Sequence, residues 1–199
     1  MRARRAEILR ETRETRVVVR VDLDGSGIVD ADTPVPFLNH MLDALGRHGR
    51  LDLTIGARGD VEIDDHHTVE DIGIVLGQAL AGAWGDKAGI ARFATAYVPM
   101  DEALARVVLD LSGRAFLHWD VPMRGPTIGG LRLFHTDLAA EFFRALTANA
   151  SITAHCDLIR GQNDHHAIEA VFKAFALALH SATRVTGLAG VIPSTKGAL

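Results

Sequence analysis

The sequence is poor in cysteine, because Cys156 is the only one among 199 residues. An intramolecular disulfide is therefore excluded, and so low a content is typical of proteins in a reducing compartment. Long apolar runs are also missing, since none approaches the roughly 18–20 residues needed to cross a bilayer. The basic residues that follow Met1 are not succeeded by the hydrophobic core of a signal peptide. We therefore expect a soluble, cytoplasmic protein with no membrane partner.

An excess of basic residues is missing as well. Lysine and arginine number 21 against 25 aspartate and glutamate residues, which gives a net charge of −4. A surface that binds nucleic acid would need the opposite balance. The 48% of hydrophobic and 23% of charged residues are ordinary for a globular protein. Against this background the 10 histidines stand out, because four of them form two adjacent pairs.

The histidine pairs belong to an internal repeat. The segment Asp64-Asp65-His66-His67-Thr68-Val69-Glu70-Asp71 reappears 99 residues later as Asn163-Asp164-His165-His166-Ala167-Ile168-Glu169-Ala170. That shift is half the chain length. A purely structural role would not require the same two imidazoles and one carboxylate in both copies of the repeat. The repeat therefore favours a functional site.

Two more matches occur upstream in the same order. The segment around His40 aligns with the segment around Glu141. Glu14 and Glu102 each stand eight residues before an Asp-Leu-x-Gly segment. Three matches in one order predict a duplicated unit.

Each half shows the same sequence of elements. We predict a first half at residues 1–92 and a second half at 93–199, packed into one compact catalytic unit. Apolar and β-branched stretches predict strands at 17–23 and 106–111, each ending at a Gly-containing hairpin turn, and further strands at 51–55 and 152–159. Helical spacing of apolar residues predicts helices at 36–47 and 136–149, and two more that begin near the histidine pairs. The predicted class is α+β, a duplicated βαβ-type unit with helices packed on one face of each sheet.

The histidine pairs can bind metal in two directions. With Asp65 and Asp164 as N-caps, helices would begin at the pairs. Residues i and i+4 share a helix face, so that His66 converges with Glu70, and His165 with Glu169. His67 and His166 lie about 100° around the helix axis and point elsewhere. The pairs are therefore expected to serve two ions, within the repeat or across a subunit contact.

The repeat also nominates His40 and Glu141 as further ligands, although Glu141 alone would be interpreted as a surface carboxylate. Ligands that are imidazole and carboxylate, without thiolate, disfavour a structural zinc site. They suit a six-coordinate ion such as Mn²⁺, with Fe²⁺ and Zn²⁺ as alternatives.

Several motifs together resemble one known family. They are Asp-Asp-His-His-Thr-x-Glu-Asp, Asp-His-His-x-x-Glu-Ala-x-Phe-Lys-Ala-Phe, the segment 36–42, the segment 110–114 and the C-terminal segment 193–197. From about Arg10 to Leu199 the chain resembles imidazoleglycerol-phosphate dehydratase. The resemblance implies two four-stranded sheets with helices packed against them, in a duplicated fold of the ribosomal-protein type. It also implies a hydro-lyase of histidine biosynthesis that uses two Mn²⁺ per active site and assembles from trimers into a homo-oligomer of 24 subunits.

The activity that the resemblance implies is dehydration of D-erythro-imidazole glycerol phosphate to imidazole acetol phosphate. The substrate's ring would be bound as an imidazolate between two metal ions, so that it expels the adjacent hydroxyl. A carboxylate must then move protons. Glu14 is the candidate, because the family places a substrate-contacting Glu there, and Glu70 or Glu169 would share the task.

The resemblance also implies the site residues. The metal ligands carried over are His40, His66, His67, Glu70, Glu141, His165, His166 and Glu169. The substrate-binding residues carried over are Glu14, His40, His48, His66, Glu70, Arg92, Arg114, His165, Lys173, Ser194, Thr195 and Lys196. Among these, Arg92, Arg114, Lys173, Ser194 and Lys196 would bind the phosphate.

Three positions depart from the family's pattern. Many members have His in place of Glu141, which leaves His135 as an alternative ligand six residues earlier. Asn39 replaces a frequent Asp, and Ala44 replaces a Gln. Two other functions stay open at this point. One is a two-metal hydrolase with a bridging hydroxide, and the other is a non-catalytic shell that stores metal.

Overall fold

The structure is a computed structural model that describes residues 3–186 and 190–197. Residues 1–2, 187–189 and 198–199, including the Leu199 end of the predicted second half, lie outside the described residues. The first half contains β1 (Arg5–Glu11), β2 (Thr15–Asp22), β3 (Val29–Asp32), α1 (Pro36–Gly49), β4 (Asp52–Gly59) and α2 (His66–Trp84). The second contains β5 (Phe93–Met100), β6 (Ala103–Asp110), β7 (Phe116–Asp120), β8 (Thr127–Gly129), β9 (Leu133–His135), α3 (Leu138–Ala150), β10 (Thr153–Arg160) and α4 (Asp164–Thr183).

The two halves build sheets of identical topology. The strand order is β1-β2-β4-β3 in one four-stranded sheet and β5-β6-β10-β7 in the other. In each sheet the first three strands are antiparallel, and the last strand pairs in parallel. Among the described residues, only the short β8–β9 hairpin has no counterpart in the other half. The predicted α+β class with two four-stranded sheets is confirmed.

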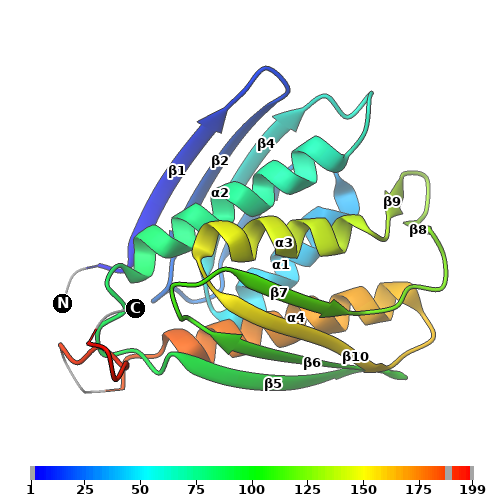
Figure 1. The fold of residues 1–199 in the computed structure, drawn as a ribbon. Coiled ribbons are helices and arrows are strands. Elements are labelled where there is room, and N and C mark those ends of the chain that lie inside the picture. The colour runs from blue at the N-terminus through cyan, green and yellow to red at the C-terminus, as the bar shows by residue number, and fades with distance from the viewer. Residues whose placement is uncertain (1–2, 187–189, 198–199) are drawn as a thin grey trace.

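The four helices lie between the two sheets (Figure 1). Helix α2 packs on β1 and β2 of its own sheet, and α4 packs on β5 and β6 of the other. The helices also pair across the halves, α2 with α3 and α1 with α4. This packing of helices from different halves decides which predicted ligands lie close together.

Helices α2 and α3 approach closely because two glycines face α3. A Cβ at Gly73 would lie 2.6 Å from the carbonyl oxygen of Phe142. A Cβ at Gly77 would lie 2.6 Å from that of Leu146. Any side chain at either position would push the two helices apart.

One hydrophobic core fills the space between the sheets and the helices. Strand β2 alternates between fully buried residues such as Val17 and Val19 and outward residues such as Arg16 and Arg20, as expected for a sheet covered on one face. Phenylalanines of α3 and α4, Phe143 and Phe172, lie with ring centroids 4.6 Å apart at the centre. Among the described residues, no helix is long and apolar enough to span a membrane.

The predicted hairpins at the Gly-containing turns after Leu23 and Leu111 are wrong. The chain instead crosses over through α1 or α3, and β3 and β7 each pair in parallel with the strand that follows the helix. The hairpin partners of β2 and β6 precede them, at β1 and β5. Strands β1 and β5 were not predicted, because these edge strands expose one face, which interrupts the apolar pattern in the sequence.

Candidate metal centre and substrate site

His40, His165 and Glu169 form a compact group of metal-ligand type. Oε2 of Glu169 lies 3.3 Å from Nε2 of His40 and 3.2 Å from Nε2 of His165. One ligand atom from each residue lies within 4.8 Å of the other two. His165 and Glu169 share a face of α4, as the i, i+4 spacing predicted. His40 belongs to the first half and arrives because α1 packs against α4.

Lys173 lies on the other side of the same carboxylate. Its Nζ is 2.6 Å from Oε1 of Glu169, one helical turn away. Burial acts to raise the pKa of Glu169, but the hydrogen bond and charge of Lys173, together with His40, outweigh it and lower the pKa. Glu169 is thus held as an anion although its side chain is only 7% exposed. A buried carboxylate in this state is suited to bind a cation.

His48 lies near this lysine, close to the C-terminal end of α1. Its pKa is lowered, first by partial desolvation of the ring and then by the positive charge of Lys173. The predicted substrate residues His48 and Lys173 therefore belong to the neighbourhood of Glu169.

The second histidine of the second pair points in another direction. Nδ1 of His166 lies 2.8 Å from Oε2 of Glu102, in the turn between β5 and β6. This hydrogen bond raises the pKa of His166. The same hydrogen bond, together with two from backbone N–H groups, lowers the pKa of Glu102 to about 2. The two rings of this pair therefore point in different directions, as the helix geometry predicted.

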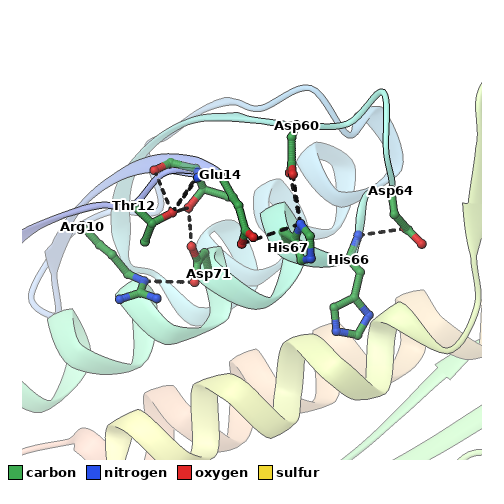
Figure 2. A network of polar contacts seen from close by, with 9 residues as sticks. Arg10, Thr12, Glu14, Asp60, Asp64, His66, His67 and Asp71 are labelled. Carbon is green, nitrogen blue, oxygen red and sulfur yellow. Dashed lines mark hydrogen bonds and ion pairs between the residues drawn. The ribbon is translucent and has the colours of Figure 1, made fainter.

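His67 has the matching position in the first half. Its Nδ1 lies 3.1 Å from Oδ2 of Asp60 and 3.8 Å from Oε2 of Glu14 (Figure 2). The hydrogen bond to Asp60 raises the pKa of His67, with support from the charge of Glu14. Glu14, the predicted proton-transfer residue, has a side chain that is 58% exposed. It is accessible beside a predicted metal ligand.

The starts of the two helices differ from the prediction. Asp65 occupies the N-cap position of α2 but makes no capping hydrogen bond, because its carboxylate binds Arg132. The backbone N–H of His66 donates to Asp64 instead. Helix α4 is capped by Asn163, and the expectation for Asp164 was wrong.

Asp164 instead stabilises the loop between β7 and β8. Its two carboxylate oxygens accept hydrogen bonds from the backbone N–H groups of Arg124 and Gly125, at 3.0 and 2.9 Å. The residue therefore holds the segment between β7 and β8 and is not available as a cap.

The remaining predicted ligands do not form a comparable group. The ring of His66 points away from His67 (Figure 2). The carboxylate of Glu141 is paired with Arg144 on α3. Within residues 3–186 and 190–197, no group of three metal-type ligands includes His66, Glu70 or Glu141. His135, the alternative to Glu141, is exposed at the end of β9.

Arg92 and Arg114 lie at the other end of α4. The guanidinium of Arg92 donates to both carboxylate oxygens of Asp110, at 2.7 and 3.1 Å. It also donates to the carbonyl oxygen of Pro193 at 2.6 Å. Arg114 approaches Asp110 within 3.8 Å.

The hydrogen bond of Arg92 places the C-terminal segment, which contains Ser194, Thr195 and Lys196, beside the two arginines. Within that segment, the N–H of Lys196 donates to Oγ of Ser194. In Figure 1 the segment 190–197, drawn in red, lies at the end of α4 opposite its start. The N–H of Arg92 donates to the carbonyl oxygen of Ala182 near the end of α4. At about 1.5 Å per residue, some 25 Å separates that position from His165.

Comparison with known proteins gives the family. Residues 33–179 match imidazoleglycerol-phosphate dehydratase. The chain belongs to the imidazoleglycerol-phosphate dehydratase family. It is 56% identical over 200 residues to the enzyme of Halorhodospira halophila, which covers 100% of both chains. It is 57% identical over 197 residues to the enzyme of Aromatoleum aromaticum, covering 98% of this chain and 100% of the relative.

Two solved structures agree with this assignment. The dehydratase from Staphylococcus aureus superposes with a TM-score of 0.82 at 44% identity, covering 92% of this chain and 99% of the other. The dehydratase from Pyrococcus furiosus gives a TM-score of 0.78 at 33% identity, covering 96% and 100%. The protein is therefore a hydro-lyase that acts on a small-molecule substrate in histidine biosynthesis.

Asp60, Glu102 and Asp110 are not among the site residues predicted from the sequence. Glu102 carried a usable signal, because the repeat aligns it with Glu14. Asp110 was noticed only as part of a turn motif, although it binds Arg92 and approaches Arg114. Asp60 has no counterpart in the repeat, and nothing in the sequence pointed to it.

Proposed function

We propose that the chain dehydrates D-erythro-imidazole glycerol phosphate with the substrate's ring held as an imidazolate between two Mn²⁺ ions. The observation that carries this proposal is the convergence of His40, His165 and Glu169 on one point. Two bound ions would act as Lewis acids that stabilise the ring in its anionic form. The other contributions come from side chains of the chain itself.

The donor set fits such ions. It consists of imidazole nitrogens and carboxylate oxygens, which suit Mn²⁺ and do not form a closed tetrahedral thiolate site. Cys156 is fully buried in β10 and separate from these residues. His40, His165 and Glu169 would hold one ion. His67 and His166, which face other directions, would contribute to a second ion together with His66, Glu70 and Glu141.

Proton transfer needs a carboxylate that reaches the substrate. We assign this role to Glu14, because its carboxylate is exposed and lies beside His67. Glu70 and Glu169 would act from the metal sphere. Dehydration requires proton loss from the carbon next to the one that loses its hydroxyl, and a positioned carboxylate accelerates such a step by about 10²- to 10⁴-fold.

The phosphate would be bound by Lys173, which lies beside Glu169, and by a second group of residues, Arg92, Arg114, Ser194 and Lys196. This group lies about 25 Å from His165, judged from the rise of α4. A single substrate is too small to bridge that distance. The separation supports a site in which the phosphate residues of one subunit meet the metal ligands of another.

The assembly of trimers into a 24-subunit particle, which the family resemblance implies, would supply such contacts between subunits, and we propose it for this chain. Within each subunit, residues 1–92 and 93–199 would form one catalytic unit. The packing of α2 on α3 and of α1 on α4, across the two halves, supports this. The single thiol supports a cytoplasmic location. Sizing of the purified protein tests the assembly, and a monomer with full activity would contradict it.

The experiment for the function combines elemental analysis with an assay for imidazole acetol phosphate. We expect two Mn²⁺ per subunit and formation of the ketone from imidazole glycerol phosphate. Release of inorganic phosphate from the substrate would indicate the two-metal hydrolase instead. Stoichiometric metal without turnover of either kind would indicate a storage shell.

A further inference from the structure

Glu102 ties together two segments that lie far apart in the sequence. Its Oε1 accepts hydrogen bonds from the backbone N–H groups of Gln162 at 3.0 Å and Asn163 at 2.8 Å. Its Oε2 lies 2.8 Å from Nδ1 of His166. Both oxygens are thus engaged, and the carboxylate joins the β5–β6 turn to the start of α4. A side chain fixed at three points has little freedom to move.

This arrangement decides which nitrogen of His166 carries the hydrogen. An ionised carboxylate only accepts hydrogen bonds, so the Nδ1 atom that faces it must be the donor. In the neutral ring the lone pair is then on Nε2, which points away from Glu102 and lies 3.9 Å from Oδ2 of the exposed Asp101, too far for a hydrogen bond. A nitrogen must present its lone pair to bind a cation, and the hydrogen bond made by the other nitrogen fixes that choice.

The first half reaches the same result with a different residue. Asp60 follows β4, and its Oδ1 and Oδ2 atoms lie 3.2 and 3.1 Å from Nδ1 of His67. Glu14, the repeat counterpart of Glu102, is farther from that nitrogen at 3.8 Å. The two halves therefore hold equivalent histidines by the same atom, but the carboxylate comes from different elements.

We propose that Glu102 and Asp60 are positioning residues that hold His166 and His67 with Nε2 free to bind metal. This inference rests on the proposed function, because it takes both histidines to be ligands. It also gives a reason why repeat-related carboxylates differ in role. Glu102 is occupied with its histidine, whereas Asp60 takes over that task in the first half and leaves Glu14 free to meet the substrate.

Titration of the metal-free, full-length protein with Mn²⁺ tests the proposal directly. Glu102→Ala should weaken binding at the affected site by roughly 10- to 100-fold, the usual effect of removing the partner of a ligating histidine. Asp60→Ala should do the same at the other histidine. Glu7→Ala is the matched control. It removes an exposed carboxylate paired with Arg20 on the outer face of the first sheet and should leave the affinity unchanged.

A double-mutant cycle separates positioning from a structural role. Glu102 also holds two backbone N–H groups, so Glu102→Ala should lower the melting temperature with or without His166. If Glu102 acts through His166, its removal should have no further effect on Mn²⁺ affinity once His166→Ala is present. The same 10- to 100-fold loss in both backgrounds would overturn the proposal.

The proposal and the proposed function fail in different ways. Weak binding by His166→Ala together with unchanged binding by Glu102→Ala would refute the positioning role and leave the ligand assignment intact. Unchanged binding by His166→Ala would show that His166 is not a ligand, which refutes both.

Discussion

Glu169 and His40 are 129 residues apart in the sequence, yet Oε2 of the one lies 3.3 Å from Nε2 of the other. The contact exists because α4 of the second half packs against α1 of the first. A carboxylate that is 7% exposed, next to two imidazoles and one ammonium group, is the electrostatic centre of the candidate metal site. The duplicated fold thus builds the candidate site by packing a helix of one half against a helix of the other.

Replacing Glu169 with Gln should abolish metal binding at this site. The substitution keeps the shape of the side chain and removes its charge, so that His40 and His165 lose the anion that they share. The loss of Mn²⁺ affinity should exceed the roughly 10- to 100-fold that follows removal of a ligand's hydrogen-bond partner. Elemental analysis after dialysis measures it, with Glu7→Gln as the control, and full retention of metal by Glu169→Gln would contradict the assignment.

Metal binding should weaken as the pH falls. The pKa values of His67 and His166 are raised by Asp60 and Glu102, so both rings keep a proton at a higher pH than an ordinary histidine. Protons therefore compete with Mn²⁺ as the pH falls through these raised values. Titrations between about pH 5.5 and 8.5, which bracket the ordinary pKa of histidine, measure the effect.

The metal-free protein should respond to pH in the opposite sense. A histidine whose pKa is raised by folding stabilises the folded state, because the folded protein binds its proton more tightly than the unfolded chain does. For His67 and His166 this stabilisation is complete below the ordinary pKa of 6.5 and is lost as the pH rises through the raised folded-state pKa. Thermal unfolding without metal should show this loss.

In the metal titrations, an apparent affinity for Mn²⁺ that does not change with pH would count against His67 and His166 as ligands.

Replacing Gly73 with Ala should destabilise the fold. The new methyl group would meet the carbonyl oxygen of Phe142 at 2.6 Å, and backbone on both helices would have to shift. Overpacking of this kind costs about 1–3 kcal/mol of unfolding free energy. Gly82 lies on the same helix, where a Cβ would meet only the methyl group of Ala6 at 3.2 Å. Denaturant unfolding should show a small effect for Gly82→Ala, and equal effects of both variants would refute the argument.

The sequence predicted what depends on local spacing. His165 and Glu169 meet because residues four apart share a helix face, and the repeat correctly predicted two copies of one α+β unit. It did not predict that His40 joins this pair, because the repeat is silent about which helices pack together. The cap at Asn163 was missed because of a tertiary contact, since the carboxylate of Asp164 accepts hydrogen bonds from backbone N–H groups of a loop about 40 residues away.

The other pair of helices, α2 and α3, shows the limit of the sequence prediction more clearly. Glu141 aligns with His40, and α3 packs on α2 as α1 packs on α4. Nevertheless Glu141 pairs with Arg144, one turn along its own helix, and does not meet His66. An aligned position therefore predicts the neighbourhood of a side chain, whereas charged neighbours decide its partner.

Replacing Arg92 should weaken phosphate binding. Arg92→Lys keeps the positive charge but loses the planar fork that now binds both oxygens of Asp110 and the carbonyl of Pro193. Hydrogen bonds to charged groups contribute about 1.5–3 kcal/mol, so KM should rise about 10- to 100-fold with a smaller change in kcat. Steady-state kinetics measure this, with Arg20→Lys as the control on the outer face of the first sheet. A fall in kcat at constant KM would place Arg92 elsewhere in the mechanism.

The most direct measurement is a crystal structure of the protein grown with Mn²⁺, with anomalous scattering used to locate the ions. We expect an anomalous peak bound by Nε2 of His40, Nε2 of His165 and a carboxylate oxygen of Glu169. A peak elsewhere, with these three side chains turned to solvent and no density between them, would contradict the metal centre on which the proposed mechanism depends.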